Sequence, residues 1–230
     1  MVSPHLTPFG WLHLLLFGVL LPLMVLRNAR RIKQRALPLP PRLVHFKSTA
    51  AVLFACFCLS VATALVQRIP LFPAGIPHPW RGLAAGVAMY VAAVLIMRPR
   101  WRAAVARRAR AVHLFVADTR AERAWWLIVS LLAGVGEEVT WRGVQTTLLV
   151  PIVGSYWMAA LLSGVSFALA HAVQGWKSVM GILGFAIGFQ ALVVASGSLY
   201  VAMAVHVAYD ITAGLTYGRL AREMGYVPDL

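Results

Sequence analysis

Charged side chains inside an apolar stretch constrain this chain more than any other feature of its sequence. The run 124–150 is otherwise apolar, yet its segment 134–143 carries Glu137, Glu138 and Arg142. On insertion scales an ionised side chain at the centre of a bilayer costs about 2.5–3.5 kcal/mol, and such residues usually serve a function. A purely structural polar cluster that holds helices together is the alternative.

Helical spacing separates the two glutamates. Glu138 and Arg142 are four residues apart with the acid first, the favourable order for an ion pair along one helix face. Glu137 is rotated by about 100° from Glu138, so it can face a cavity while its neighbour is neutralised. The spacing therefore predicts a supporting ion pair between Glu138 and Arg142, with Glu137 available for chemistry.

The composition indicates a polytopic membrane protein. Of the 230 residues, 60% are hydrophobic and only seven are acidic, and the mean hydropathy is +0.77. We expect an all-α membrane helix bundle with about seven transmembrane helices and room for an eighth within 98–123. The other predicted spans are 9–26, 48–66, 83–97, 156–171, 179–195 and 199–217, and a helix that starts near Thr119 covers the charged segment.

We expect one membrane domain over residues 1–230. Residues 1–118 would supply N-terminal helices with basic loops, 119–217 the core with the polar residues, and 218–230 a tail on the inner side. The second basic stretch also holds an apolar patch, which predicts an amphipathic helix in the headgroup region. The patch consists of Val112, Leu114, Phe115 and Val116.

The net charge of +14 indicates membrane topology and not nucleic-acid binding, because the basic residues flank apolar spans. Most of the 21 Lys and Arg residues, Arg35 among them, fall in alternate connections. The positive-inside rule then places the N-terminus outside and the C-terminus in the cytoplasm. Contact with anionic lipid is a further expectation. Cys56 and Cys58 lie two apart in an apolar run, without metal-binding spacing.

Three more titratable residues fall inside predicted spans: His171, His206 and Asp210. A lone histidine there could simply bond a carbonyl oxygen, and Asp210 could simply fix the tautomer of His206. Together with the glutamates they occupy three helices, which predicts a shared polar cavity. A carboxylate beside one imidazole can deprotonate water, and a second imidazole can bind a developing oxyanion. That combination suits hydrolysis of an amide.

These residues also form three ordered motifs that resemble those of the CAAX-protease and bacteriocin-processing family. This family comprises glutamate-type intramembrane endopeptidases and includes the Ras-converting CAAX enzyme. The resemblance covers about residues 121–217. The motifs are Glu137-Glu138-x-x-x-Arg142, Phe167-x-x-x-His171 and His206-x-x-x-Asp210.

The resemblance implies a role for each residue. Glu137 would activate the attacking water, His171 would help to hold or polarise it, and the Glu138–Arg142 pair would support them. His206 and Asp210 would stabilise the oxyanion. The CAAX enzymes typically have Asn at the last position, whose amide donates a hydrogen bond, whereas an ionised Asp has no proton to donate. Asp210 would therefore be protonated or act by holding His206.

Two alternatives remain open. The glutamate mechanism needs no cofactor, but Glu137, His171 and His206 could instead bind zinc and leave one position for water. A different class is a proton-coupled transporter or a non-catalytic scaffold, because intramembrane Glu and His residues also relay protons. Inverted repeats are typical of transporters, and the sequence has no convincing internal repeat.

The expected partners are the lipid bilayer and a membrane-anchored protein or peptide as substrate, with no nucleic acid. The reaction would be C-terminal processing or sorting of that substrate. The sequence is rich in arginine and alanine, a composition that we associate with bacteria. The expected location is therefore the bacterial cytoplasmic (inner) membrane.

Overall fold

The computed structural model describes residues 6–34 and 38–227, and every regular element within these ranges is helical. Arg35, 36–37 and the two ends of the chain, 1–5 and 228–230, lie outside the described residues. The elements are α1 (Pro8–Leu15), η1 (Leu16–Leu20), α2 (Leu21–Lys33), α3 (Arg42–Gln67), α4 (Pro79–Ala106), η2 (Arg110–Leu114), α5 (Arg120–Glu137), η3 (Glu138–Gln145), α6 (Thr146–Val153), α7 (Tyr156–Leu169), η4 (Ala172–Gln174), α8 (Trp176–Ser196) and α9 (Leu199–Glu223). Both η1 and η3 are π-helical, whereas η2 and η4 are 3₁₀ turns.

Five helices in the described part of the chain are long and apolar enough to cross a membrane. They are Pro8–Ile32 (α1, η1 and most of α2), α3, α4, α8 and α9. Helix α7 is apolar but shorter, and α5 carries charged residues near both of its ends. The region 98–123 holds the end of α4, the turn η2 and the start of α5, so the eighth span that we allowed for there is absent.

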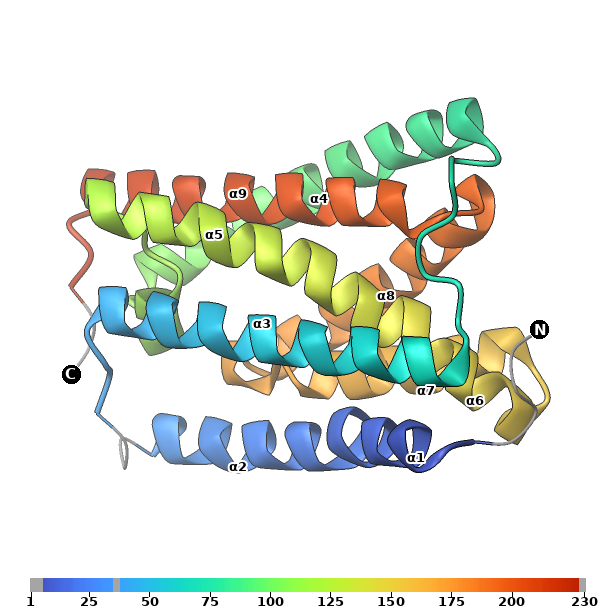
Figure 1. Cartoon of the computed structure of the whole chain (residues 1–230). Helices are drawn as coiled ribbons and strands as arrows, with labels where there is room; N and C mark the ends of the chain where they lie inside the picture. Colours follow the sequence, from blue (N-terminus) through green and yellow to red (C-terminus); the bar gives the residue numbers. More distant parts are fainter. Residues whose placement is uncertain (1–5, 35–37, 228–230) are drawn as a thin grey trace.

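The basic connections gather at one end of the bundle. Helices α2 and α9 end there, and α3 and α5 begin there (Figure 1). The proline-containing connection from α3 to α4 runs at the opposite end (Figure 1). The two ends therefore differ strongly in charge, as the sequence predicted.

The apolar patch in the second basic stretch is not a headgroup helix, so that prediction was wrong. Val112 and Val116 are buried in a core cluster with Trp101 and Leu220. Val112 and Leu114 lie in the turn η2, and Phe115 and Val116 directly follow it. Helix α9, whose Leu220 packs in the same cluster, continues to Glu223, beyond the predicted boundary at 217. Protein side chains, and not lipid, cover the apolar surface.

A capping box starts α5, as its sequence spacing predicts. The Thr119 hydroxyl accepts from the N–H of Glu122 at 3.1 Å, and a Glu122 carboxylate oxygen accepts from the N–H of Thr119 at 2.9 Å. Burial would raise the pKa of Glu122, but the N–H groups of Thr119 and Asp118 and the Arg42 guanidinium outweigh it. They hold the pKa of this carboxyl below its usual value, ahead of the apolar part of the helix.

Helices α5 and α9 approach each other closely at glycines. A Cβ atom on Gly134 would collide with Val207, and one on Gly214 would collide with the indole of Trp126. The Trp126 Nε1–H also donates to the carbonyl oxygen of Asp210 at 2.9 Å. Absence of a side chain at these two positions lets α9 lie directly against α5, which brings their polar residues together.

Candidate active site

The glutamates occupy a change of helix type. The α-helix ends at Glu137, and Glu138–Gln145 continue it as a π-helix. At its end the N–H of Thr146 donates to the carbonyl oxygen of Trp141, five residues earlier. Such segments are rare and occur frequently at functional sites. No local spacing rule that we applied to the sequence predicts one.

Side-chain hydroxyls bond the carbonyl groups of this segment. An apolar bundle offers little water, so backbone polar groups need partners from the protein. The bonds are Thr140 Oγ1 to Gly136 O (2.7 Å), Thr146 Oγ1 and Ser163 Oγ to Trp141 O (2.8 Å each) and Thr147 Oγ1 to Gly143 O (2.6 Å). The carbonyl groups in and next to the π-helix thus accept hydrogen bonds from threonines of η3 and α6 and from Ser163 of α7.

His13 supports the same segment from the first helix, and the sequence reasoning missed it. Its ring is fully buried, and Nε2 lies 3.3 Å from the carbonyl oxygen of Thr140, to which only a protonated nitrogen can donate. The ring also lies 4.6 Å from that of Phe17, which meets Trp141 edge-on at 5.7 Å. The signal was available, because His13 is the one titratable residue in the apolar run 9–26.

Glu138 is fully buried and has two partners. Its Oε1 accepts a hydrogen bond from His206 Nδ1 at 2.8 Å and lies 3.3 Å from Arg142 Nη1, so the predicted ion pair is present. The Arg142 guanidinium also lies 4.3 Å from the ring centre of Phe167 and 5.4 Å from that of Phe189. Aromatic faces attract a cation in this position. Glu138 therefore connects Arg142 to the histidine of α9.

Glu137 lies between the two histidines. Its Oε2 is 3.9 Å from His171 Nε2 and 3.8 Å from His206 Nε2. Asp210 Oδ2 is 3.7 Å from the same nitrogen of His206. The structure thus brings the four expected catalytic side chains together. They come from α5, from α9 and, for His171, from the turn between α7 and η4.

The hydrogen bonds assign the protons on His171. Its Nδ1 lies 2.8 Å from the carbonyl oxygen of Phe167. A carbonyl oxygen only accepts, so Nδ1 carries a proton. In the neutral ring Nε2 then presents a lone pair, and this atom faces Glu137. Two acceptors at this separation suit a water that donates to both.

Both ring nitrogens of His206, unlike those of His171, face carboxylates. Because its Nδ1–H donates to Glu138, Nε2 is the atom that faces the carboxylates of Glu137 and Asp210. The cluster holds three carboxyl groups and one permanent cation, Arg142. A proton on His206 Nε2 would point between the two carboxylates and would give this face of the site a hydrogen-bond donor.

The length of α7 explains how His171 reaches the site. At 1.5 Å per residue its 14 residues span about 21 Å, less than the roughly 30 Å of a hydrocarbon core. The chain turns through η4 and returns along α8. The predicted span 156–171 is therefore slightly too long, because α7 ends at Leu169. His171 follows this short helix at the turn into η4, where its Nε2 faces Glu137.

The same side chains fit a zinc ion poorly. Two ligands of a tetrahedral zinc at about 2.0–2.1 Å lie roughly 3.4 Å apart, whereas Glu137 Oε2 is 3.9 and 3.8 Å from the two imidazole nitrogens. Within residues 6–34 and 38–227, no group of three or more His, Cys, Asp or Glu side chains is placed to hold a metal ion.

Comparison with known proteins gives one match. Residues 119–212 match the family model described as type II CAAX prenyl endopeptidase Rce1-like. The matched segment contains Glu137, Glu138, His171, His206 and Asp210. No curated protein and no solved structure matches the chain.

Proposed function

From the match of residues 119–212 to the Rce1-like family of type II CAAX prenyl endopeptidases, we propose that this chain is a glutamate-dependent intramembrane endopeptidase. This is a CAAX protease family, and the chain is a multi-pass membrane protein with five candidate spans in its described part. The observation that carries the proposal is the position of Glu137 Oε2, 3.8 and 3.9 Å from two imidazole nitrogens.

Glu137 is the general base of the proposed reaction. It takes a proton from a water that also donates to His171 Nε2, and the water oxygen attacks the carbonyl carbon of the scissile peptide. Carboxyl base catalysis of this kind contributes about 10²–10⁴-fold. When the tetrahedral intermediate collapses, the protonated Glu137 returns its proton to the leaving amine. The C–N bond breaks, and the carboxylate is ready for another cycle.

His206 is the proposed oxyanion donor. With a proton on both ring nitrogens, Nδ1–H is held by Glu138 at 2.8 Å and Nε2–H points into the site. Loss of one such donor typically costs about 10²–10³ in kcat. Asp210 would keep that proton in place through its carboxylate, 3.7 Å away. This role requires no hydrogen bond donated by Asp210 itself.

We further propose seven membrane segments, with α5–η3–α6 and α7 added to the five long apolar helices. The basic end of the bundle would face the cytoplasm of a bacterial cell, with the N-terminus outside. The catalytic core would comprise 119–217. The substrate would be a membrane-anchored protein or peptide, cleaved for C-terminal processing or sorting, and the reaction would require no cofactor.

Cleavage of membrane-anchored candidate peptides by the purified protein in lipid nanodiscs tests the proposal. Glu137→Gln keeps the shape of the side chain and removes the base, so we expect kcat to fall by at least about 100-fold. Glu223→Gln is a matched control, because this glutamate is exposed and far along α9. Both variants are measured with and without a strong chelator.

The outcomes separate the mechanisms. Activity that is lost in Glu137→Gln but retained with the chelator supports glutamate-activated water. Activity that the chelator removes and zinc restores would establish the metal alternative at Glu137, His171 and His206. If the wild-type protein cleaves no peptide of a broad anchored library, the transporter or scaffold reading takes precedence.

A further inference from the structure

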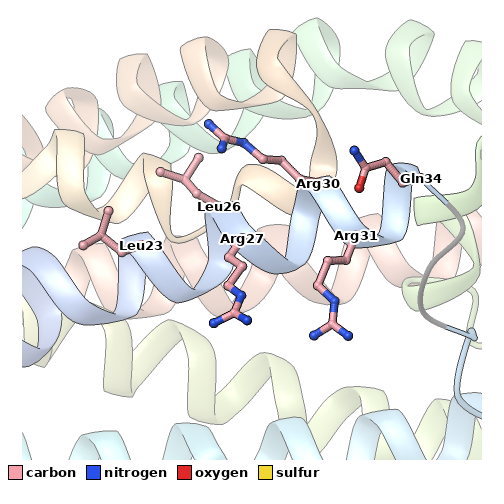
Figure 2. A pocket seen from close by; sticks show the side chains of 6 residues that line it. All are labelled: Leu23, Leu26, Arg27, Arg30, Arg31 and Gln34. Atoms are coloured by element: carbon pink, nitrogen blue, oxygen red, sulfur yellow. The ribbon is translucent and has the colours of Figure 1, made fainter.

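A groove runs along α2, away from the candidate active site. Its volume is about 340 Å³. In Figure 2, Arg27 and Arg31 extend to one side of the helix, whereas Leu26 and Arg30 extend to the other. The lining residues are Leu23, Leu26, Arg27, Arg30, Arg31 and Gln34.

Along the helix, the groove changes from an apolar part to a cationic part. Leu23 is 58% exposed and lies on the apolar, membrane-crossing part of the helix. The three arginines follow toward the basic end of the bundle. From Leu23 to Gln34 the helix rises about 16 Å. A ligand that fills the groove therefore combines an apolar body with an anionic head.

The arginines are available for such a head. No ion pair among the described side chains includes Arg27, Arg30 or Arg31. Guanidinium groups bind phosphate oxygens in a planar, often bidentate geometry. Their guanidinium groups extend to opposite sides of the helix (Figure 2), so they would turn toward a phosphate bound on the helix face between them by rotation of their exposed, flexible side chains.

The helix end that carries these arginines is held in place. Arg110 Nη1 donates to the carbonyl oxygen of Ile32 at 3.1 Å, and α2 packs against η4, the turn that directly follows His171. Positively charged side chains at the cytoplasmic end of a span attract anionic lipids. A ligand in the groove would thus contact the helix that supports the loop after His171.

We propose that this groove is a binding site for an anionic phospholipid. The acyl chains lie against Leu23 and Leu26, and Arg27, Arg30 and Arg31 bind the headgroup phosphate. A soluble phosphate would use only the arginine part, so its affinity for the groove is lower. Lipid binding here is independent of the proposed proteolysis and is measured without any substrate.

Native mass spectrometry of the detergent-solubilised protein with added phosphatidylglycerol or phosphatidylcholine tests the site. We expect the wild type to retain phosphatidylglycerol preferentially. The triple variant R27Q/R30Q/R31Q should bind it at least about tenfold more weakly, since each arginine near a membrane surface contributes to this attraction. The matched control R98Q/R100Q/R102Q removes the same charge from the exposed arginines of α4.

Equal retention of phosphatidylglycerol by the triple variant and the α4 control would overturn the assignment, because the effect would then be one of net charge. A second arm adds inorganic phosphate to the wild type. Displacement of the lipid by phosphate at comparable concentration would assign the groove to a soluble anion instead. Unchanged thermal unfolding of both variants shows that they are folded.

Discussion

The Nδ1 atom of His206 donates a 2.8 Å hydrogen bond to Oε1 of Glu138, a residue 68 positions earlier in the chain. The same oxygen lies 3.3 Å from Arg142 Nη1. One buried carboxylate therefore fixes the orientation of the proposed oxyanion donor and neutralises a buried guanidinium. The proposed site would therefore depend on Glu138 as well as on the neighbouring Glu137, although Glu138 would not touch the substrate.

Removal of one member of the buried pair should destabilise the protein strongly. We expect Glu138→Ala or Arg142→Ala to lower the free energy of unfolding by about 3–5 kcal/mol, because each leaves an uncompensated buried charge. The double variant should lose less than the sum of the two single losses. SDS-driven unfolding in bicelles measures all three, and strictly additive losses would show that the two charges do not interact.

The contact between His13 and Thr140 predicts an effect on catalysis from the first helix. His13→Leu removes the side-chain donor to a buried carbonyl oxygen, which costs about 1–3 kcal/mol. A shift of the π-helix would lower kcat by about tenfold to 100-fold, with a smaller change in KM.

His13→Gln serves as the control, because it retains an N–H donor at this position. It should recover part of the lost kcat. If both variants lose equal activity in proportion to their loss of stability, His13 has only a packing role.

Close packing of α5 against α9 should be sensitive at Gly134. Gly134→Ala places a methyl group into Val207, and overpacking of this kind costs about 1–3 kcal/mol. Since the same contact sets the distance from Glu138 to His206, peptide cleavage should fall as well. Gly184→Ala is the matched control, because no atom lies within 4 Å of a Cβ there. A Gly134→Ala variant with wild-type stability and activity would contradict the close approach.

Asp210 should act through His206. Asp210→Ala should lower kcat by at least about tenfold, but by less than the 10²–10³ expected for loss of the oxyanion donor itself. Asp210→Asn should be the milder change, because its amide oxygen can still accept from Nε2–H of His206. The comparison uses kcat for one peptide in identical nanodiscs. An Asn variant weaker than the Ala variant would argue against a hydrogen-bonding role.

Glu122 predicts a pH-dependent stability. Its pKa is lowered from the ordinary 4.5 in the folded protein, so its ionised form stabilises the fold above that pH. The contribution is lost as the pH falls through the lower, folded-state pKa. Thermal unfolding followed by tryptophan fluorescence should therefore separate wild type from Glu122→Gln at pH 7. The separation should shrink below pH 4.5, and a constant difference would exclude the charge as its cause.

Hydropathy and capping patterns were sufficient for much of the fold. The spans at α3, α8 and α9 follow from apolar length, and the start of α5 follows from the spacing of Thr119 and Glu122. The apolar patch at Val112 was wrongly predicted to lie in the headgroup region, because apolar side chains can be buried equally well by lipid or by protein. Sequence periodicity carries no information about which of the two covers it.

The candidate site also has features that the sequence predicted and features that it did not. The spacing of Glu138 and Arg142 predicted their contact because both lie in one helix. The π-helix was not predictable, since its carbonyl groups are bonded by His13 and Ser163 from distant parts of the chain. The bond from His206 to Glu138 likewise depends on how closely α9 approaches α5, which the glycine at position 134 permits.

The shortness of α7 sets a length requirement for any chain that is to be cut. If α7 begins at the outer membrane surface, its 14 residues stop about 9 Å before the inner one. An extended peptide covers that depth with about three residues. A folded domain pressed against the bilayer would leave its last residues out of reach of Glu137, whereas a loose tail of a few residues would be accessible. The length of the flexible segment next to a membrane anchor would thus limit which substrates can be cleaved, whatever their sequence.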